Sequence, residues 1–67
     1  MEGLAQKLKD LRLEKGLDKS EVSKLLGLSK NAFGNYEAGI REPSLDILKR
    51  ICIIFEVSSD YLLGLEN

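Results

Sequence analysis

The 67-residue sequence contains no histidine and no tryptophan, and it has one cysteine and one proline. Without histidine and with a single cysteine it lacks the usual zinc ligands and the usual base of a nucleophilic triad, and one cysteine cannot form a disulfide within the chain. Metal-dependent and acyl-transfer chemistry are therefore poor expectations. We expect no enzyme, no metal, no cofactor and no small-molecule ligand.

Long hydrophobic runs are also missing. No apolar stretch approaches the roughly 20 residues that span a bilayer, and the first residues lack the basic segment of a secretory signal. The single cysteine, Cys52, lies in the apolar run Ile51–Phe55, where a small buried hydrophobe is favoured over a redox sensor. A cytoplasmic, reducing location without a membrane partner is the expectation.

The composition is 43% apolar and 31% charged, which is typical of a folded domain rather than a disordered segment. A chain of 67 residues has room for one hydrophobic core, so residues 1–67 are expected to form a single domain. The net charge of -1 carries no basic signature of nucleic-acid binding. However, residues 1–50 carry ten cations and eight acids, whereas residues 51–67 carry three acids and no cation. The chain is therefore electrically polarised along its length.

Apolar residues recur at helical spacing, and no alternating strand pattern is present. Glycines and capping residues divide the chain into five predicted helices, which makes the fold class all-α. The helices lie between Gly3 and Gly16, at Lys19–Leu26, at Lys30–Glu37, at Leu45–Phe55, and from Ser58 to Leu63. Their predicted N-caps are Asp18, which forms a capping box with Glu21, and the serines Ser29, Ser44 and Ser58.

The second and third helices are short and are joined by the tight turn Gly27–Ser29, as in a helix-turn-helix. Phe33 and Tyr36 are expected to anchor the back of the third helix. Its outer face, which contains no acid, would be free to enter a DNA major groove. That face consists of Lys30, Asn31, Gly34 and Asn35.

The apolar residues of two other helices are expected to face the core. They are Val22, Leu25 and Leu26 on the second helix, and Tyr61, Leu62 and Leu65 on the last.

Four stretches of the sequence resemble the XRE or phage-repressor (Cro-like) helix-turn-helix family and follow the order found in that family. The resemblance covers nearly the whole chain. The stretches are Leu8–Arg12, Gly27–Ser29, Tyr36–Leu45 and Val57–Gly64. The third stretch, with Glu-x-Gly followed by Arg-x-Pro, is the most specific. The resemblance implies a compact five-helix, lambda-repressor-like domain. It also implies a sequence-specific transcriptional regulator, expected to be a repressor, that places its third helix in the major groove of double-stranded DNA.

The resemblance also implies roles for individual residues. Base reading falls on Lys30, Asn31 and Asn35, since asparagine suits adenine and lysine suits guanine. Phosphate contacts fall on Lys19, Ser29 and Arg41. The alternatives are that Lys19 and Lys30 are ordinary solvated lysines, that Ser29 is first of all a helix cap, and that Arg41 serves only the solubility of its loop. The family's structural ion pair would join Arg12 to Glu37.

Three residues depart from the family pattern. Lys19 replaces a common glutamine, and Ser23 replaces a small alanine, so that its hydroxyl needs a partner such as a preceding carbonyl. Gly34 costs about 1 kcal/mol relative to alanine inside a helix. It either allows close approach of DNA or marks a lost base contact.

Members of this family usually bind as dimers, and the fourth helix has more apolar residues than one core can bury. If Leu48, Ile51, Cys52 and Phe55 fill the core, then Ile47, Ile53 and Ile54 cannot all be buried. Ile53 and Leu65 are the residues predicted for a homodimer contact, the alternative being a slightly apolar surface. The alternative function is a protein-interaction module of the same fold, such as an antitoxin, with weak or no DNA binding. The low sequence pI, about 5.3, favours that alternative.

Overall fold

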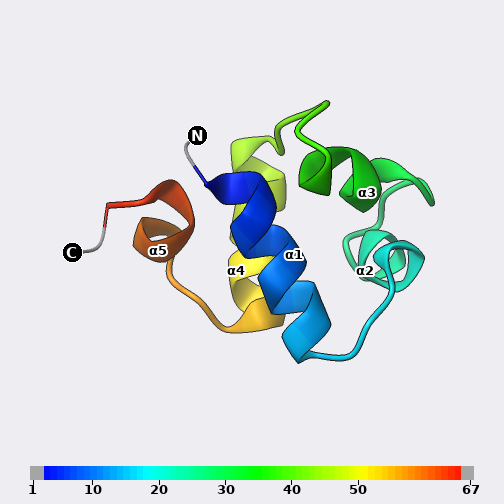
Figure 1. Cartoon of the computed structure of the whole chain (residues 1–67), viewed down its shortest axis with the longest axis horizontal. Coiled ribbons are helices and arrows are strands. Elements are labelled where there is room, and N and C mark those ends of the chain that lie inside the picture. The colour runs from blue at the N-terminus through cyan, green and yellow to red at the C-terminus, as the bar shows by residue number, and fades with distance from the viewer. Residues whose placement is uncertain (1–2, 66–67) are drawn as a thin grey trace.

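A computed structural model describes residues 3–65. In this range the chain forms five helices and no strand. They are α1 (Leu4–Glu14), α2 (Lys19–Leu25), α3 (Ala32–Glu37), α4 (Leu45–Phe55) and α5 (Ser59–Leu63). The all-α, five-helix prediction is confirmed. Figure 1 shows α2 and α3 together at one end of the molecule and α5 at the other, with α1 and α4 between them.

Three of the predicted N-caps are present. The Asp18 carboxylate accepts a hydrogen bond from the Glu21 N–H at 2.8 Å, and the Glu21 side chain accepts one from the Asp18 N–H at 2.9 Å. The first of these bonds holds the pKa of Asp18 below its usual value, because it stabilises the ionised carboxylate. Ser44 accepts from the Ile47 N–H at 3.3 Å, and Ser58 accepts from the Tyr61 N–H at 3.0 Å.

Side chains from all five helices meet in one hydrophobic core. The longest helices, α1 and α4, supply most of it, and Phe33 of α3 is completely buried among them. A chain of this size buries little surface, so a core shared by all five helices is what stabilises it without a disulfide. The buried apolar residues are Leu4, Leu8, Leu11, Val22, Leu26, Phe33, Ile47, Leu48, Ile51, Phe55 and Leu62.

Two residues predicted to face inward are exposed. Leu25 is 58% exposed, because α2 buries the side that carries Val22 and Ser23, and Leu25 lies outside that side. Leu65 is also exposed, because it follows Gly64, whose left-handed backbone ends α5 and turns the chain away from the core. In α5 itself, Leu62 is buried and Tyr61 is half-buried.

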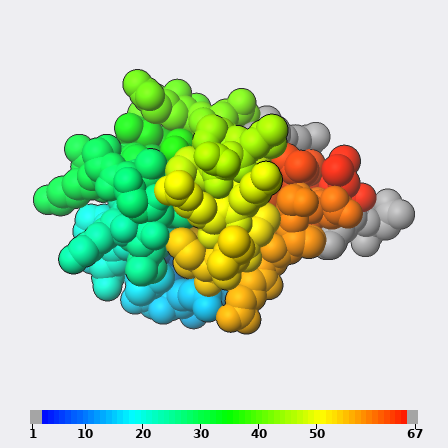
Figure 2. All heavy atoms as spheres, turned by 180° about the vertical axis from the view of Figure 1, so that it is seen from behind, coloured from blue at the N-terminus to red at the C-terminus, as the bar shows by residue number. Residues whose placement is uncertain are grey.

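The surplus of apolar residues on α4 is divided between core and surface. Ile47 is buried, Cys52 and Ile54 are half-buried, and Ile53 is 75% exposed. Figure 2 shows α4 crossing the surface on the side opposite to that of Figure 1, between the α2–α3 end and α5. The prediction that these isoleucines cannot all be buried is confirmed, and Ile53 is the one left outside.

Lys7 of α1 holds α5 in place. Its ammonium donates a hydrogen bond to the Tyr61 carbonyl at 2.8 Å and lies 5.2 Å from the centre of the Tyr61 ring. A cation at the carboxyl end of a helix also interacts favourably with the free carbonyls there. The short α5 is therefore attached to α1 by polar contacts as well as by Leu62.

The hydroxyl of Ser23 joins α2 to α3. Ser23 is fully buried, and its Oγ accepts a hydrogen bond from the Phe33 N–H at 2.9 Å. The partner is thus an amide of the next helix. No residue at the start of α3 caps this helix with its own side chain, so Ser23 satisfies one of its free N–H groups from outside.

We predict that Ser23→Ala lowers the free energy of unfolding by about 1–3 kcal/mol, because it leaves the buried Phe33 N–H without its acceptor. Thermal unfolding should show a Tm lower by roughly 4–8 °C per kcal/mol lost. Ser20→Ala is the matched control on the same helix, since the Ser20 hydroxyl bonds only the exposed Asp18 side chain and its loss should change stability by less than about 0.5 kcal/mol. Equal Tm values for the two variants would contradict the role given to Ser23.

Candidate nucleic-acid interface

The turn between α2 and α3 is fixed by hydrogen bonds at the end of α2. Gly27 has a left-handed backbone, with φ of 74°, and the Leu28 N–H that follows donates to the Ser23 carbonyl at 2.9 Å. From α4, the Arg50 guanidinium donates to the Leu26 carbonyl at 3.0 Å. The free carbonyls at this helix end are thereby satisfied, and the direction in which the chain leaves α2 is set.

The start of α3 differs from the prediction. The helix begins at Ala32, so Lys30 and Asn31 lie in the preceding turn, and Ser29 is not its side-chain cap. The Ser29 backbone carbonyl accepts from the Ala32 N–H at 3.0 Å instead. The side-chain acceptor at this helix end is the Ser23 hydroxyl, which reaches the Phe33 N–H from α2. The Ser29 side chain is exposed and is not used as an N-cap.

Aromatic packing supports α3 from behind, as the sequence predicts. The Phe33 ring lies edge-on to the Tyr36 ring, with 6.3 Å between centroids and an interplanar angle of 82°. The same ring lies 6.3 Å from the ring of Phe55 on α4. Such offset and edge contacts add to the free energy of burying the rings. The back of α3 is therefore part of the core.

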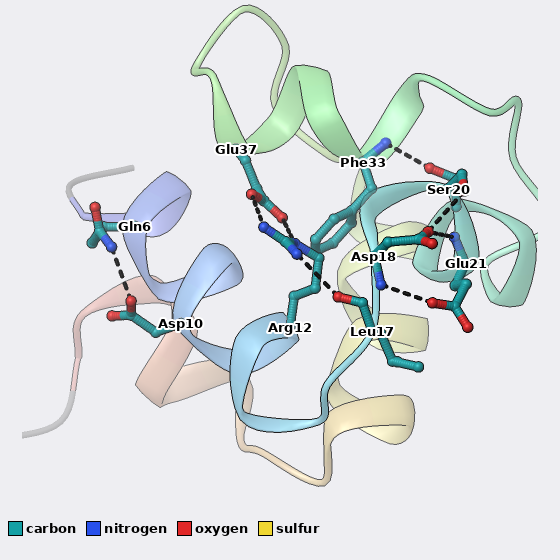
Figure 3. A network of polar contacts seen from close by, with 10 residues as sticks. Gln6, Asp10, Arg12, Leu17, Asp18, Ser20, Glu21, Phe33 and Glu37 are labelled. Atoms are coloured by element: carbon teal, nitrogen blue, oxygen red, sulfur yellow. Dashed lines mark hydrogen bonds and ion pairs between the residues drawn. The ribbon is translucent and has the colours of Figure 1, made fainter.

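A buried ion pair fixes the other end of α3. Figure 3 shows the Arg12 guanidinium between Glu37 and the Leu17 carbonyl. Arg12 Nε and Nη2 donate to the two Glu37 carboxylate oxygens at 2.6 and 3.2 Å, and Nη1 donates to Leu17 O at 3.0 Å. Only 10% of the Arg12 side chain and 5% of the Glu37 side chain are exposed. The pair expected from the family resemblance is present, and the hydrogen bonds that Arg12 donates to Glu37 raise the pKa of Arg12.

The outer side of α3 borders a shallow hollow shared with the start of α2. All three predicted base-reading residues and the predicted phosphate contact Lys19 lie in its wall, although they come from different segments. This arrangement brings two ammonium groups and two amide groups to one surface. The lining residues are Arg12, Asp18, Lys19, Ser20, Lys30, Asn31, Gly34 and Asn35.

The remaining predicted DNA contacts lie on the other side of Asn35. Ser29 and Arg41 line a second hollow with Leu28, Ala32, Asn35 and Tyr36. The backbone places Arg41 here, because the Ile40 and Arg41 N–H groups both donate to the Asn35 carbonyl, at 3.0 and 3.3 Å. Asn35 lines both hollows. The structure thus brings all the predicted DNA contacts to the surface around α3.

Ser20 and Asp18 line the first hollow without having been predicted for it. The Ser20 hydroxyl donates to Asp18 Oδ1 at 2.8 Å, the same oxygen that accepts from the Glu21 N–H. Asp18 is therefore an acid at the edge of the basic surface, and its carboxylate is engaged in the capping box. The position of Ser20 next to Lys19 in the first turn of α2 was the available sequence signal.

The residues predicted for self-association lie elsewhere. Ile53 lines an apolar groove over α4 and α5 with Leu45, Leu48, Lys49, Cys52, Ser59 and Leu63. Leu65 is exposed but is not part of that groove. Burial raises the pKa of the Cys52 thiol, which keeps it in its neutral form.

Over residues 3–65, no three acidic or cysteine side chains are placed to hold a metal ion together. Within the same range, no helix is both long enough and apolar enough to cross a membrane.

A helix-turn-helix family profile matches residues 8–62. The chain is 37% identical over 62 residues to the uncharacterized HTH-type transcriptional regulator YobD of Bacillus subtilis, covering 92% of this chain and 55% of that protein. It is 36% identical over 61 residues to the HTH-type transcriptional regulator ImmR of the same organism, covering 91% and 48% of the two chains. The cryptic phage CTXphi transcriptional repressor RstR of Vibrio cholerae is 32% identical over 53 residues, covering 79% and 48%.

The chain spans about half the length of these curated relatives. The profile match includes all of α2, the turn and α3. It covers about four-fifths of the chain. From the match and the helical arrangement together, the chain belongs to the helix-turn-helix family.

Proposed function

We propose that this chain is a sequence-specific DNA-binding domain of a transcriptional regulator and that it acts by placing α3 in the major groove. The observation that carries the proposal is the exposed surface around α3, where Lys30, Asn31 and Asn35 lie together while Phe33 holds the helix from behind. The relatives named as transcriptional regulators and as a phage repressor support it. The function requires no catalytic group.

The side chains on this surface suit direct reading of bases. Asn31 is exposed and Asn35 is half-exposed, and an asparagine amide can donate to and accept from adenine at the same time. Lys30 is exposed beside them and suits the acceptor atoms of guanine. Asn35 lies inside α3, where asparagine is a poor helix former, so local stability does not account for it. Asn31 lies in the turn before α3 and makes no side-chain cap hydrogen bond there.

The charges around α3 suit contact with phosphate. Residues 19–41 carry four cations and two acids, and one of those acids, Glu37, is buried against Arg12. Lys19 and Arg41 lie on either side of the outer surface and are assigned phosphate contacts, with Ser29 as a further hydroxyl donor. The helix α5, which carries Asp60 and no cation, lies at the opposite end of the molecule (Figure 1), away from this surface.

We further propose that the DNA-bound species is a homodimer, joined through the apolar groove around Ile53. Ile53 is 75% exposed, and Leu45 and Leu63 lie in the same groove, so a second copy would cover a continuous apolar surface. Two copies would read two half-sites about 34 Å apart on the same side of the duplex. Leu65, exposed but outside the groove, is assigned to the periphery of this contact.

Selection of bound sequences from a random DNA pool should enrich a defined site. On that site we predict that Asn31→Ala and Asn35→Ala each weaken binding by about 1–3 kcal/mol, because each removes a hydrogen-bonding amide from a base edge. On a scrambled duplex the same variants should bind as the unchanged chain does. Fluorescence anisotropy with both duplexes measures the difference.

Two further variants serve as controls for that experiment. Gln6→Ala removes an exposed amide that bonds Asp10 on α1, outside both hollows, and should leave both affinities unchanged. Arg41→Ala should weaken binding to both duplexes alike, because a phosphate contact carries no sequence information.

The salt dependence of binding counts the phosphate contacts. If each copy makes about four of them, a plot of the logarithm of the dimer's binding constant against the logarithm of the salt concentration should have a slope of about -7. Failure to enrich any sequence, with equally weak binding to all duplexes, would favour the protein-interaction module instead.

Sedimentation equilibrium at micromolar concentration should show a dimer that Ile53→Asp converts to a monomer, because a carboxylate in the middle of an apolar contact must lose its hydration when the contact forms. Ile40→Asp is the matched control, since Ile40 is 72% exposed but lies in the loop after α3. It should leave the dimer intact. A chain that sediments only as a monomer, both alone and with its selected DNA, would rule the dimer out.

A further inference from the structure

Among the described residues, Gly34 is the one glycine whose backbone conformation other residues adopt readily. The sequence has six glycines, and the other five, at positions 3, 16, 27, 39 and 64, all have φ between 68° and 75°, a region that other residues rarely adopt. Gly34 lies inside α3 without a positive φ. Since glycine destabilises a helix interior relative to alanine, the reason for Gly34 must lie in its surroundings.

The space above Gly34 is occupied by the side chain of Lys19 from α2. A Cβ built on Gly34 would lie 3.4 Å from Lys19 Cδ, at the short end of van der Waals contact. Among the described residues, no other heavy atom outside the local backbone would come within 4 Å of that Cβ. The gap left by the glycine is therefore filled by the aliphatic stem of one lysine.

We propose that Gly34 is a positioning residue for Lys19: the missing side chain lets the Lys19 stem lie against α3, which keeps its ammonium on the surface formed by Lys30, Asn31 and Asn35. This inference rests on the proposed DNA-binding function and deepens it. Lys19 and Gly34 line the same hollow as those three residues. Holding a long side chain in place before binding reduces the conformational entropy lost when DNA arrives.

Gly34 and Lys19 thus act together on the surface formed by Lys30, Asn31 and Asn35. A Cβ at position 34 would press on a flexible side chain rather than on backbone, so Gly34→Ala is compatible with folding. Its helix propensity is higher, and the variant should therefore melt at the same or a higher temperature. Its effect on DNA should come through Lys19, and a double-mutant cycle can isolate such a coupling.

The experiment measures affinity for the selected duplex, by anisotropy, for Gly34→Ala in three backgrounds. In the unchanged chain, the substitution should weaken binding about three- to tenfold without lowering Tm. With Lys19→Ala already present, Gly34→Ala should cost less than about twofold, because the side chain that it displaces is gone. With Lys24→Ala present, the full loss should remain, since Lys24 is on α2 but does not line the hollow.

A second readout does not depend on DNA. In the free protein, NMR should show a nuclear Overhauser effect between the Lys19 δ-methylene protons and the Gly34 α protons, and its absence would overturn the inference. An equal loss of affinity with and without Lys19 would also overturn it, since the Cβ would then obstruct DNA directly. These results leave the proposed function standing. A chain that enriches no DNA sequence at all would overturn the proposed function, and the inference with it.

Discussion

The ion pair between Arg12 and Glu37 is the interaction on which the placement of α3 depends. A helix of six residues is not stable alone, so its position must come from tertiary contacts. Arg12 makes two hydrogen bonds to Glu37 and a third to the Leu17 carbonyl, which ties α1, the loop before α2 and the end of α3 together. Removing either charge would leave the other buried without a partner, at a cost of about 3–5 kcal/mol.

Ser23 provides the corresponding contact at the beginning of α3. Its hydroxyl accepts from the Phe33 N–H, while the Phe33 ring packs against Tyr36 and Phe55. The helix is thus held at both ends by side chains of other helices and from behind by the core. The outer side chains are then presented on a preformed surface, and binding DNA need not include the cost of ordering α3.

Much of this could be predicted from the sequence, because its signals are local. The capping box at Asp18, the serine caps of α4 and α5 and the glycine after α2 each satisfy helix-end groups within a few residues. Contacts between helices could not be found in this way. The Ser23 hydroxyl bonds an amide ten residues later, and the late start of α3 and the exposure of Leu25 likewise depend on how the helices pack, so none of the three was predicted. Glu56 ends α4 in a left-handed conformation that no glycine signals. The Arg12–Glu37 pair was expected only from the family resemblance.

The most direct test of this account is native-state hydrogen exchange at the Phe33 amide, measured by NMR on the free protein. The amide of Ile51, in the middle of α4 and fully buried, serves as the reference for global unfolding. If α3 is held at both ends as part of the core, the protection of Phe33 should lie within about tenfold of that of Ile51. Protection of Phe33 that is lower by about 100-fold or more would mean that α3 opens independently, and would contradict the account.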